Sequence, residues 1–327
     1  MTGISILHSD LGIPPSAIST KSIMSNKENH SKINNVVIAG GTHGNELIGI
    51  YLVKKFIRLP DFIQKSSFST FSFLANPKAI ELCVRYIDKD LNRCFLKQDL
   101  KNKSPELYEE KRAIEINQMI GPKGNPKTDF IIDIHTTTSN MGITLIVAND
   151  SVVNMNIATY ICMLNPNVRV FRYSSFDQDK PFLSSICELG FALEVGPVAQ
   201  GAVDSNIFFQ AEDVILSILD CIENINLNGL SHLYKAVSGK SLNYYEYLGK
   251  IDYPRDQTGD IAAMIHPNLI GNDYSELRAK DPIFVGFENQ TFEYDGDSSV
   301  FPVFIGEVAY YEKDIAMFLT NKKTLRF

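Results

Sequence analysis

The chain has 327 residues, of which 44% are hydrophobic and 21% charged, and its formal net charge is −7. This composition is ordinary for a globular protein of enzyme size, and the length favours one large and one smaller domain. The negative charge without a basic stripe excludes a typical nucleic-acid-binding protein, and no apolar run approaches the roughly 18 residues of a membrane-spanning helix.

Residues 1–32 differ from the rest of the chain because they are rich in Ser, Lys, Asn and Pro and show no sustained periodicity. This composition predicts a disordered leader. The polar run after Met24 leads directly into the first apolar segment, which makes Met24 an alternative start of the protein.

From Asn35 onward, short apolar runs alternate with segments of helical spacing. Strands are expected at 36–39, 69–74, 129–135, 143–147, 168–172 and 191–195. Helices are expected at 45–57, from 76–77 onward, and at 105–120, 152–163 and 208–225. This β-α alternation predicts an α/β domain over residues 33–228, in which a mixed sheet has helices on both faces.

Beyond residue 228 the pattern changes. Helical periodicity fades, and short apolar runs at 283–287, 291–294 and 300–305 are separated by Asp, Gly and Pro. We therefore expect a smaller, mostly β domain over residues 229–327.

The segment from Val36 to Glu46 contains the first candidate site residues. Its apolar run is typical of a buried strand, Gly40 and Gly41 end that strand, and helical spacing begins after Glu46. His43 and Glu46 would then emerge together at a strand-to-helix turn, as two of the three protein ligands of a catalytic zinc site. The alternative is a surface His and a first-turn Glu that favours the helix dipole.

His135 is the other histidine of the first domain, since His8 and His30 lie in the leader and His232 and His266 in the second domain. It ends an expected strand, where α/β enzymes place their sites. Asp133, two residues earlier, could orient a metal ligand through a hydrogen bond. The alternative is a neutral His that caps a loop.

Glu194 lies within the apolar run at 191–195. An isolated buried carboxylate is costly unless it is paired, protonated or functional. A general base with a raised pKa is the functional interpretation, and a buried pair with an arginine is the structural one.

The segment 85–95 is irregular and rich in charged and amide groups. Arg85, Asn92 and Arg93 could bind a carboxylate or polarise a carbonyl. Surface ion pairs with Asp88 and Asp90 are the alternative interpretation.

The five cysteines are scattered along the chain without a Cys-x-x-Cys pair: Cys83, Cys94, Cys162, Cys187 and Cys221. An odd number without a regular spacing favours buried thiols in a reducing compartment over disulfides. The first residues also lack the basic and apolar segments of a signal peptide. We therefore expect a cytoplasmic protein.

These segments resemble, in the same order, those of the aspartoacylase and succinylglutamate desuccinylase family. The similarity extends from about residue 34 to 313. The matching segments are Gly-Gly-Thr-His-Gly-Asn-Glu at 40–46, Arg-Tyr-Ile-Asp-Lys-Asp-Leu-Asn-Arg at 85–93, Asp-Ile-His-Thr-Thr-Thr-Ser-Asn-Met-Gly at 133–142, Glu-Val-Gly-Pro-Val-Ala-Gln-Gly at 194–201, Asp-Tyr-Pro-Arg-Asp at 252–256, Ile-His-Pro-Asn-Leu at 265–269 and Glu-Val-Ala-Tyr-Tyr-Glu-Lys at 307–313.

The resemblance implies a zinc-carboxypeptidase-like fold whose added C-terminal β domain narrows the active site. It also implies a hydrolase of N-acyl amino acids with one zinc ion per subunit, in a family that tends to form homodimers. From the charge and the apolar runs described above, we expect neither nucleic acid nor a membrane as a partner. The implied metal ligands are His43, Glu46 and His135. The other implied roles belong to Glu194 as the base that also contacts the substrate, Arg85 at the acyl carbonyl, Asn92 and Arg93 at the α-carboxylate, Tyr310 as a closing residue, and Asp133 and Asp90 as supporting groups.

Two positions near the substrate's side chain depart from the family's pattern. Ser184 stands where the family has an arginine, and Lys180 where it has a tyrosine. Asp314 also replaces a lysine. Fewer cations should weaken selection for aspartate unless Lys180 compensates.

The sequence thus predicts a zinc amidohydrolase acting on N-acetyl-L-aspartate. The alternatives are the same chemistry on another N-acyl amino acid, such as an aromatic one, and a zinc-binding protein without turnover.

Overall fold

The structure is a computed structural model that describes residues 32–149, 151–173 and 179–327. The predicted leader therefore lies outside the described residues except for Lys32. Met24, His8 and His30 lie outside them as well.

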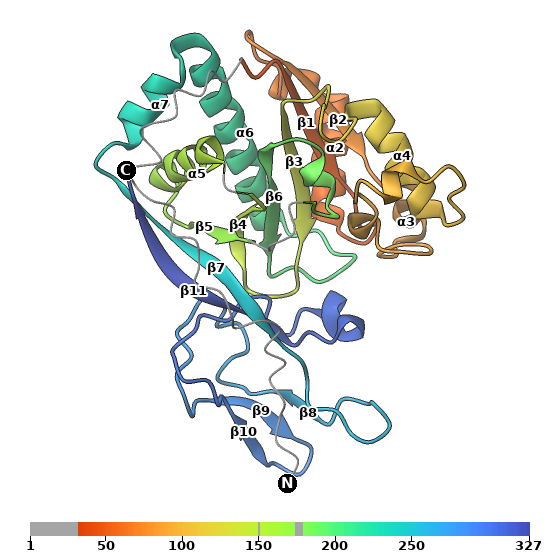
Figure 1. The fold of residues 1–327 in the computed structure, drawn as a ribbon, viewed down its shortest axis with the longest axis vertical. Helices are drawn as coiled ribbons and strands as arrows, with labels where there is room; N and C mark the ends of the chain where they lie inside the picture. Colours follow the sequence, from red (N-terminus) through yellow and green to blue (C-terminus); the bar gives the residue numbers. More distant parts are fainter. Residues whose placement is uncertain (1–31, 150, 174–178) are drawn as a thin grey trace.

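A large mixed sheet forms the centre of the molecule. Its strands are β1 (Asn35–Gly40), β2 (Ser69–Leu74), β3 (Phe130–Thr136), β4 (Gly142–Val147), β5 (Val168–Arg172), β6 (Leu189–Gly196), β7 (Ser241–Ile251) and β11 (Met317–Arg326). The eight strands lie in the order β11-β7-β5-β4-β6-β3-β1-β2 (Figure 1). β4 and β6 pair antiparallel, as do β7 and β11, and the other neighbours are parallel.

Helices cover both faces of this sheet, as expected. They are α2 (Leu47–Arg58), α3 (Pro77–Leu82), α4 (Tyr108–Ile120), α5 (Val152–Leu164), α6 (Ser205–Asn228) and α7 (Leu230–Val237). Side chains alternate between the two faces of a strand. Accordingly, Val36 and Ile38 of β1 join a core with α2, α5, α6 and α7, whereas Val37 and Ala39 join a second core with α4. The predicted α/β fold class is confirmed.

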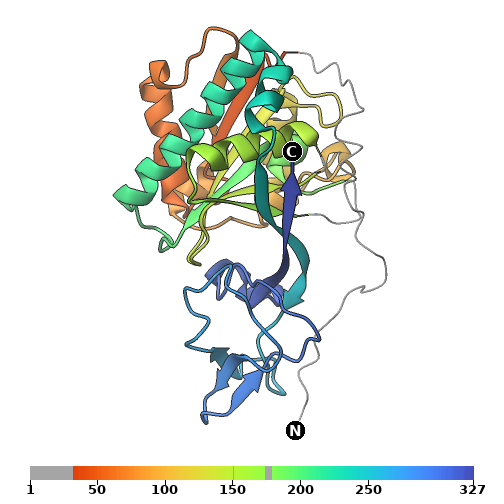
Figure 2. The same ribbon diagram turned by 90° about the vertical axis from the view of Figure 1, so that its left-hand side faces the viewer.

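A second, smaller sheet lies in the C-terminal part of the chain. It consists of β8 (Ala263–Ile265), β9 (Pro282–Gly286) and β10 (Thr291–Glu293), which are antiparallel in the order β10-β9-β8. The long strands β7 and β11 reach from the large sheet toward this part (Figure 2). The expected β-rich C-terminal part is therefore confirmed.

Two expectations about the C-terminal part were wrong. Helix α7 follows α6 after Gly229, although helical spacing was expected to fade there. The run at 300–305 forms no strand, and only isolated bridges occur, from Val300 to Leu277 and from Val303 to Phe318. The domain boundary after residue 228 stays a prediction, because the chain beyond it contributes strands to both sheets.

Among the described residues, no helix has both the length and the apolar character needed to cross a bilayer.

The topology brings the carboxyl ends of three parallel strands to one edge of the sheet. From β1 the chain passes to β2 on one side and returns to β3 on the other, and β6 lies beside β3. Open α/β sheets bind ligands at the point where the strand order reverses in this way. A site is therefore expected at the carboxyl ends of β1, β3 and β6.

Candidate active site

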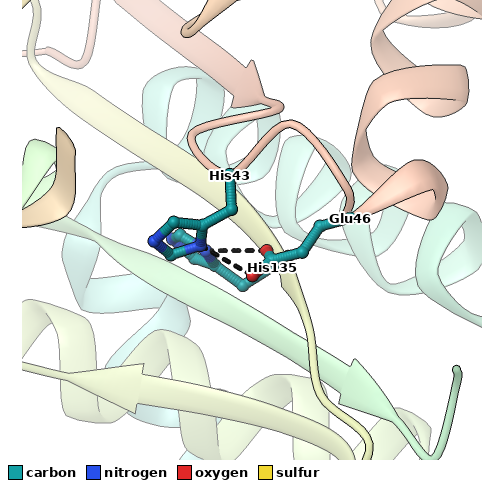
Figure 3. Close-up of side chains that lie close together, drawn as sticks. All are labelled: His43, Glu46 and His135. Atoms are coloured by element: carbon teal, nitrogen blue, oxygen red, sulfur yellow. Dashed lines mark hydrogen bonds and ion pairs between the residues drawn. The ribbon is translucent and has the colours of Figure 1, made fainter. Parts of the chain in front are cut away.

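Three buried side chains converge at this edge of the sheet (Figure 3). His43 comes from the turn after β1, Glu46 directly precedes α2, and His135 lies near the end of β3. One potential ligand atom from each of them lies within 4.8 Å of the others. The group could therefore hold a metal ion.

Glycines allow the turn that carries His43. Gly41 has a φ of +70°, which favours glycine. At Gly44 a Cβ atom would lie 2.0 Å from the backbone carbonyl carbon of Ala79, so no larger residue fits there without movement. The Gly44 amide donates to the carbonyl of Arg85 at 3.2 Å. The turn is thus packed against the segment that supplies further site residues.

Both imidazoles direct Nδ1 toward Glu46. The distances from Nδ1 to the Glu46 carboxylate are 2.6 Å for His43 and 3.1 Å for His135. On the outer side, His43 Nε2 lies 3.0 Å from Asp90 Oδ1, and His135 Nε2 lies 2.9 Å from Asp133 Oδ2. A carboxylate that accepts a hydrogen bond from Nε2–H keeps the proton on that nitrogen. The lone pair of Nδ1 is then available for a metal. Asp90 and Asp133 therefore lie where a carboxylate could orient each of the two candidate metal ligands.

The charges around Glu46 and Asp90 keep both groups ionised. Burial alone would raise the pKa of Glu46, but His43 and His135 outweigh it and hold that pKa well below its usual value. The same opposition applies to Asp90, where His43 and Arg85 outweigh burial and lower the pKa. Ionised carboxylates are the form needed for binding a metal and for orienting an imidazole.

Glu194 lies beside the cluster on β6. It is the register partner of His135 on β3, and it is 7% exposed at the wall of a cavity. Burial raises the pKa of Glu194 well above its usual value, although the neighbouring His135 acts in the opposite direction. A carboxyl group whose pKa is raised in this way holds a proton more readily than an ordinary glutamate, which suits a general base that takes up a proton and later returns it.

Arg85 points into the site and not to the surface. Its Nη1 donates to Glu46 Oε1 at 3.1 Å, and its Nη2 lies 3.6 Å from Asp90 Oδ2. The side chain is 16% exposed and both of its partners are buried. The alternative of an ion pair with Asp90 is therefore correct for Arg85, but the pair lies inside the site and not at the surface.

Asn92 and Arg93 lie on the short helix η2 (Leu91–Arg93) and line the same cavity. Asn92 Oδ1 accepts from the Leu183 amide at 2.9 Å, and Asn92 Nδ2 lies 3.4 Å from His135 Nε2. Arg93 Nη1 donates to the Asn92 carbonyl at 2.8 Å, and its guanidinium carbon lies 5.3 Å from the centre of the Phe182 ring. Both side chains are thus held at the cavity wall.

Tyr310 reaches the same cavity from the short helix η5 (Val308–Lys313) in the C-terminal part. Burial raises the pKa of Tyr310, so its hydroxyl keeps its proton and can donate to an anion. Lys313 Nζ, on the same helix, lies 2.5 Å from Asp90 Oδ2. The two parts of the molecule therefore meet at the site.

Glu307, which the sequence analysis did not assign a role, makes a second connection between the two parts. Its Oε2 accepts hydrogen bonds from the Thr137 hydroxyl, the Thr138 amide at 2.7 Å and the Thr138 hydroxyl at 2.9 Å. Its Oε1 accepts from the Ala309 amide at 3.0 Å. The signal available in the sequence was an acidic residue three positions before Tyr310.

We expect Glu307→Ala to lower the free energy of unfolding by about 3 kcal/mol, because it removes a buried charged acceptor and leaves the Thr138 amide without it. Chemical denaturation measures this change. Glu312→Ala, at an exposed position of the same segment, should change the value by less than about 0.5 kcal/mol. Equal stabilities of the two variants would contradict the assigned contact.

The cavity has a volume of about 440 Å³. Most of the polar groups described above form one part of its lining: His43, Glu46, Arg85, Asn92, Arg93, His135, Glu194, Glu307 and Tyr310. The aromatic side chains form another part: Phe171, Tyr173, Phe182, Phe304, Tyr310 and Phe318. The sequence analysis missed these rings except for Tyr310, because they come from separate elements and no local pattern joins them.

The departures from the family pattern have different places in the structure. Lys180 and Ser184 line the cavity, so both can contact a bound molecule. The Asp314 side chain is 68% exposed, and one of its oxygens lies 3.4 Å from Arg255 Nη2. The expected influence of Asp314 on substrate choice therefore has no support from its position.

Comparisons with known proteins identify the family of the chain. Residues 32–222 match the model of the succinylglutamate desuccinylase/aspartoacylase catalytic domain, and residues 240–322 match the AstE/AspA barrel-sandwich hybrid domain. The chain belongs to the succinylglutamate desuccinylase/aspartoacylase family. The resemblance inferred from the sequence is thereby confirmed.

Several members of this family are similar over most of their length. A protein from Trichodesmium erythraeum named probable aspartoacylase is 50% identical, over 90% of this chain and 99% of the relative. The Mus musculus N-acyl-aromatic-L-amino acid amidohydrolase (carboxylate-forming) is 40% identical, over 88% of this chain and 90% of the relative. The crystal structure of murine aminoacylase 3 superimposes with a TM-score of 0.85 at 37% identity, covering 90% of this chain and 97% of that one.

Proposed function

We propose that this protein is a zinc-dependent hydrolase that cleaves the amide bond of N-acyl amino acids and holds one zinc ion per chain. The observation that carries the proposal is the convergence of His43, Glu46 and His135 beside Glu194 at a cavity of substrate size. Two imidazole nitrogens and a carboxylate fit zinc, whose catalytic sites use three protein ligands and keep one position open. The names of the relatives, aspartoacylase and amidohydrolase, support the same reaction.

The proposed mechanism assigns a role to each polar residue of the cavity. Bound zinc supplies a Lewis acid that lowers the pKa of water. Glu194 takes a proton from the attacking water molecule and later delivers it to the departing amine nitrogen. Arg85 stabilises the negative charge that develops on the acyl oxygen. Asn92, Arg93 and Tyr310 donate hydrogen bonds to the α-carboxylate of the substrate, which fixes the amide bond in place.

N-acetyl-L-aspartate is the first candidate substrate. The 50% identity to a protein named probable aspartoacylase supports it. Lys180 lines the cavity and is the cation that we assign to the side-chain carboxylate of aspartate. In this role Lys180 compensates for Ser184.

An N-acyl aromatic amino acid is the second candidate substrate. The observation that favours it is the aromatic part of the cavity wall, where the Tyr173 ring lies 5.7 Å from Phe182 and 6.2 Å from Phe171. Ring-to-ring packing contributes about 0.5–1.5 kcal/mol beyond area burial, so such a wall favours an aromatic side chain. The relative named for N-acyl aromatic amino acids supports the same choice.

Steady-state hydrolysis of N-acetyl-L-aspartate, N-acetyl-L-glutamate and N-acetyl-L-tyrosine tests the proposal, together with the zinc content of the same preparation. We expect turnover of at least one substrate by the zinc-loaded protein and none after chelation. Preference for the tyrosine derivative would keep the chemistry and select the second candidate. No turnover by fully loaded protein would favour the alternative of a zinc-binding protein without catalysis.

The role of Lys180 can be tested with one substitution. Lys180→Met should lower kcat/KM for N-acetyl-L-aspartate at least about 10-fold, because a charged hydrogen bond contributes about 1.5–3 kcal/mol. The value for N-acetyl-L-tyrosine should change less than about 3-fold, since that side chain offers no carboxylate. Lys101→Met, at an exposed position, serves as the control. Equal losses on both substrates would exclude a specific contact with aspartate.

We further propose that the protein is located in the cytoplasm. All five cysteines are free thiols, which is typical of proteins in a reducing compartment. A homodimer is proposed from the family resemblance.

A further inference from the structure

A buried carboxylate outside the cavity holds the segment that supplies Arg85, Asn92 and Arg93. Glu109 is the second residue of α4 and has no exposed surface. It does not line the cavity. The mechanism above gives it no role, although a buried ionised group is costly unless its hydrogen bonds are satisfied.

The hydrogen bonds of Glu109 go to three consecutive backbone amides. Its Oε1 accepts from Ile87 N at 2.7 Å, and its Oε2 accepts from Asp88 N at 3.0 Å and from Lys89 N at 3.1 Å. Asn76 Nδ2 adds a fourth bond at 3.2 Å. Both oxygens of one carboxylate thus bind the backbone of an irregular segment.

The segment binds the helix in return. Asp88 Oδ2 accepts from the Tyr108 amide at 2.8 Å, at the first turn of α4. The first amides of a helix lack partners within the helix, so this bond satisfies one of them. Residues 87–89 and the start of α4 are therefore locked together by reciprocal bonds between backbone amides and carboxylates.

We propose that Glu109 is a positioning residue for recognition of the substrate's α-carboxylate. The three amides that it holds lie between Arg85 and Asp90, and the chain continues directly into η2 with Asn92 and Arg93. By fixing residues 87–89, Glu109 keeps η2 in the place where these two side chains face the cavity. This inference rests on the proposed function, which assigns the α-carboxylate to Asn92 and Arg93.

The chemistry of the contact requires a carboxylate. A glutamine has the same shape, but it offers one carbonyl oxygen, and its amide group would face a backbone N–H that also donates. A position that needs two accepting oxygens is therefore disturbed by Glu109→Gln without a change in volume. His43, Glu46 and His135 lie on other elements, so all three ligands remain. Asp90 directly follows the segment and contacts His43 Nε2 at 3.0 Å, so the zinc content of each variant is measured as well.

Glu109→Gln in the full-length, zinc-loaded protein tests the inference, with Glu110→Gln as the matched control. Glu110 is the next residue of α4, and it contacts the same segment through the Lys89 side chain at 3.2 Å and not through its backbone. Two substrates are compared: the N-acetyl amino acid that wild-type protein cleaves best, and the same molecule with its α-carboxylate converted to a carboxamide.

We expect Glu109→Gln to lower kcat/KM for the carboxylate substrate at least about 10-fold and to lower the preference for carboxylate over carboxamide at least about 5-fold, with one zinc ion still bound. Glu110→Gln should leave both values within about 2-fold of wild type. An equal fractional loss on both substrates would indicate a merely structural role and overturn the inference. Identical behaviour of the two variants would overturn it too.

A second measurement does not depend on turnover. Hydrogen exchange of the amides of residues 87–89 should be at least about 10-fold faster in Glu109→Gln than in Glu110→Gln, because the opened segment loses its acceptors. Unchanged exchange would overturn the inference whatever the activity. If wild-type protein cleaves none of the substrates, the proposed function fails, and the exchange rates alone decide whether Glu109 holds the segment.

Discussion

Purified Glu194→Gln protein should bind zinc as the wild type does and hydrolyse its substrate about 10³-fold more slowly, within the 10²–10⁴-fold range of general acid–base catalysis. Glutamine has the shape of glutamate but cannot take a proton from water or return it to the amine. His43, Glu46 and His135 are left unchanged. Steady-state kinetics and metal analysis of the same preparation measure both parts of this expectation.

The matched control for this variant is Glu188→Gln, because Glu188 is exposed and directly precedes β6. It should keep wild-type turnover, since it does not line the cavity. Full activity of Glu194→Gln would remove Glu194 from the mechanism and require another base. Loss of zinc from that variant would instead indicate that the substitution disturbs the neighbouring His135.

Much of the fold could be predicted because its central strands are strongly apolar. Every residue of β3 is buried, and the sequence of this strand is a nearly continuous apolar run that only Asp133 and His135 interrupt. The pairing of β5 with β7 could not be predicted in the same way. It joins segments far apart in the chain through only two register pairs, Phe171 with Tyr245 and Arg172 with Glu246. Helix α7 was missed because eight residues give little periodicity.

In the site, too, some residues could be found from the local sequence, whereas others depend on contacts between segments far apart in the chain. His43, Glu46, His135 and Glu194 stand at strand ends or inside apolar runs, where the residue type alone draws attention. Glu109 and Glu307 carry no such signal, because their function depends on amides that lie 20 to 22 and 169 positions away in the chain. The aromatic wall depends in the same way on tertiary packing.

His135→Ala should lose both zinc and turnover. The substitution removes one of the three candidate ligands and leaves His43 and Glu46, which is fewer than catalytic zinc sites use. It also leaves Asp133, which has no exposed surface, with Thr42 Oγ1 at 2.8 Å but without the imidazole. We expect zinc affinity to fall more than about 100-fold, beyond the 10–100-fold effect typical of changes at a residue that only supports a ligand. Competition with a chromophoric chelator measures this affinity.

Two further variants provide comparisons for the zinc affinity of His135→Ala. Asp133→Asn should lower zinc affinity by about 10–100-fold, because it keeps the ligand but weakens the acceptor that orients it. His232→Ala, at an exposed histidine of α7, should change nothing. Retention of zinc by His135→Ala would contradict the assigned ligand set. Because Glu194→Gln and His135→Ala should lose turnover alike but differ in bound zinc, the pair separates the loss of the base from the loss of the metal, which neither variant does alone.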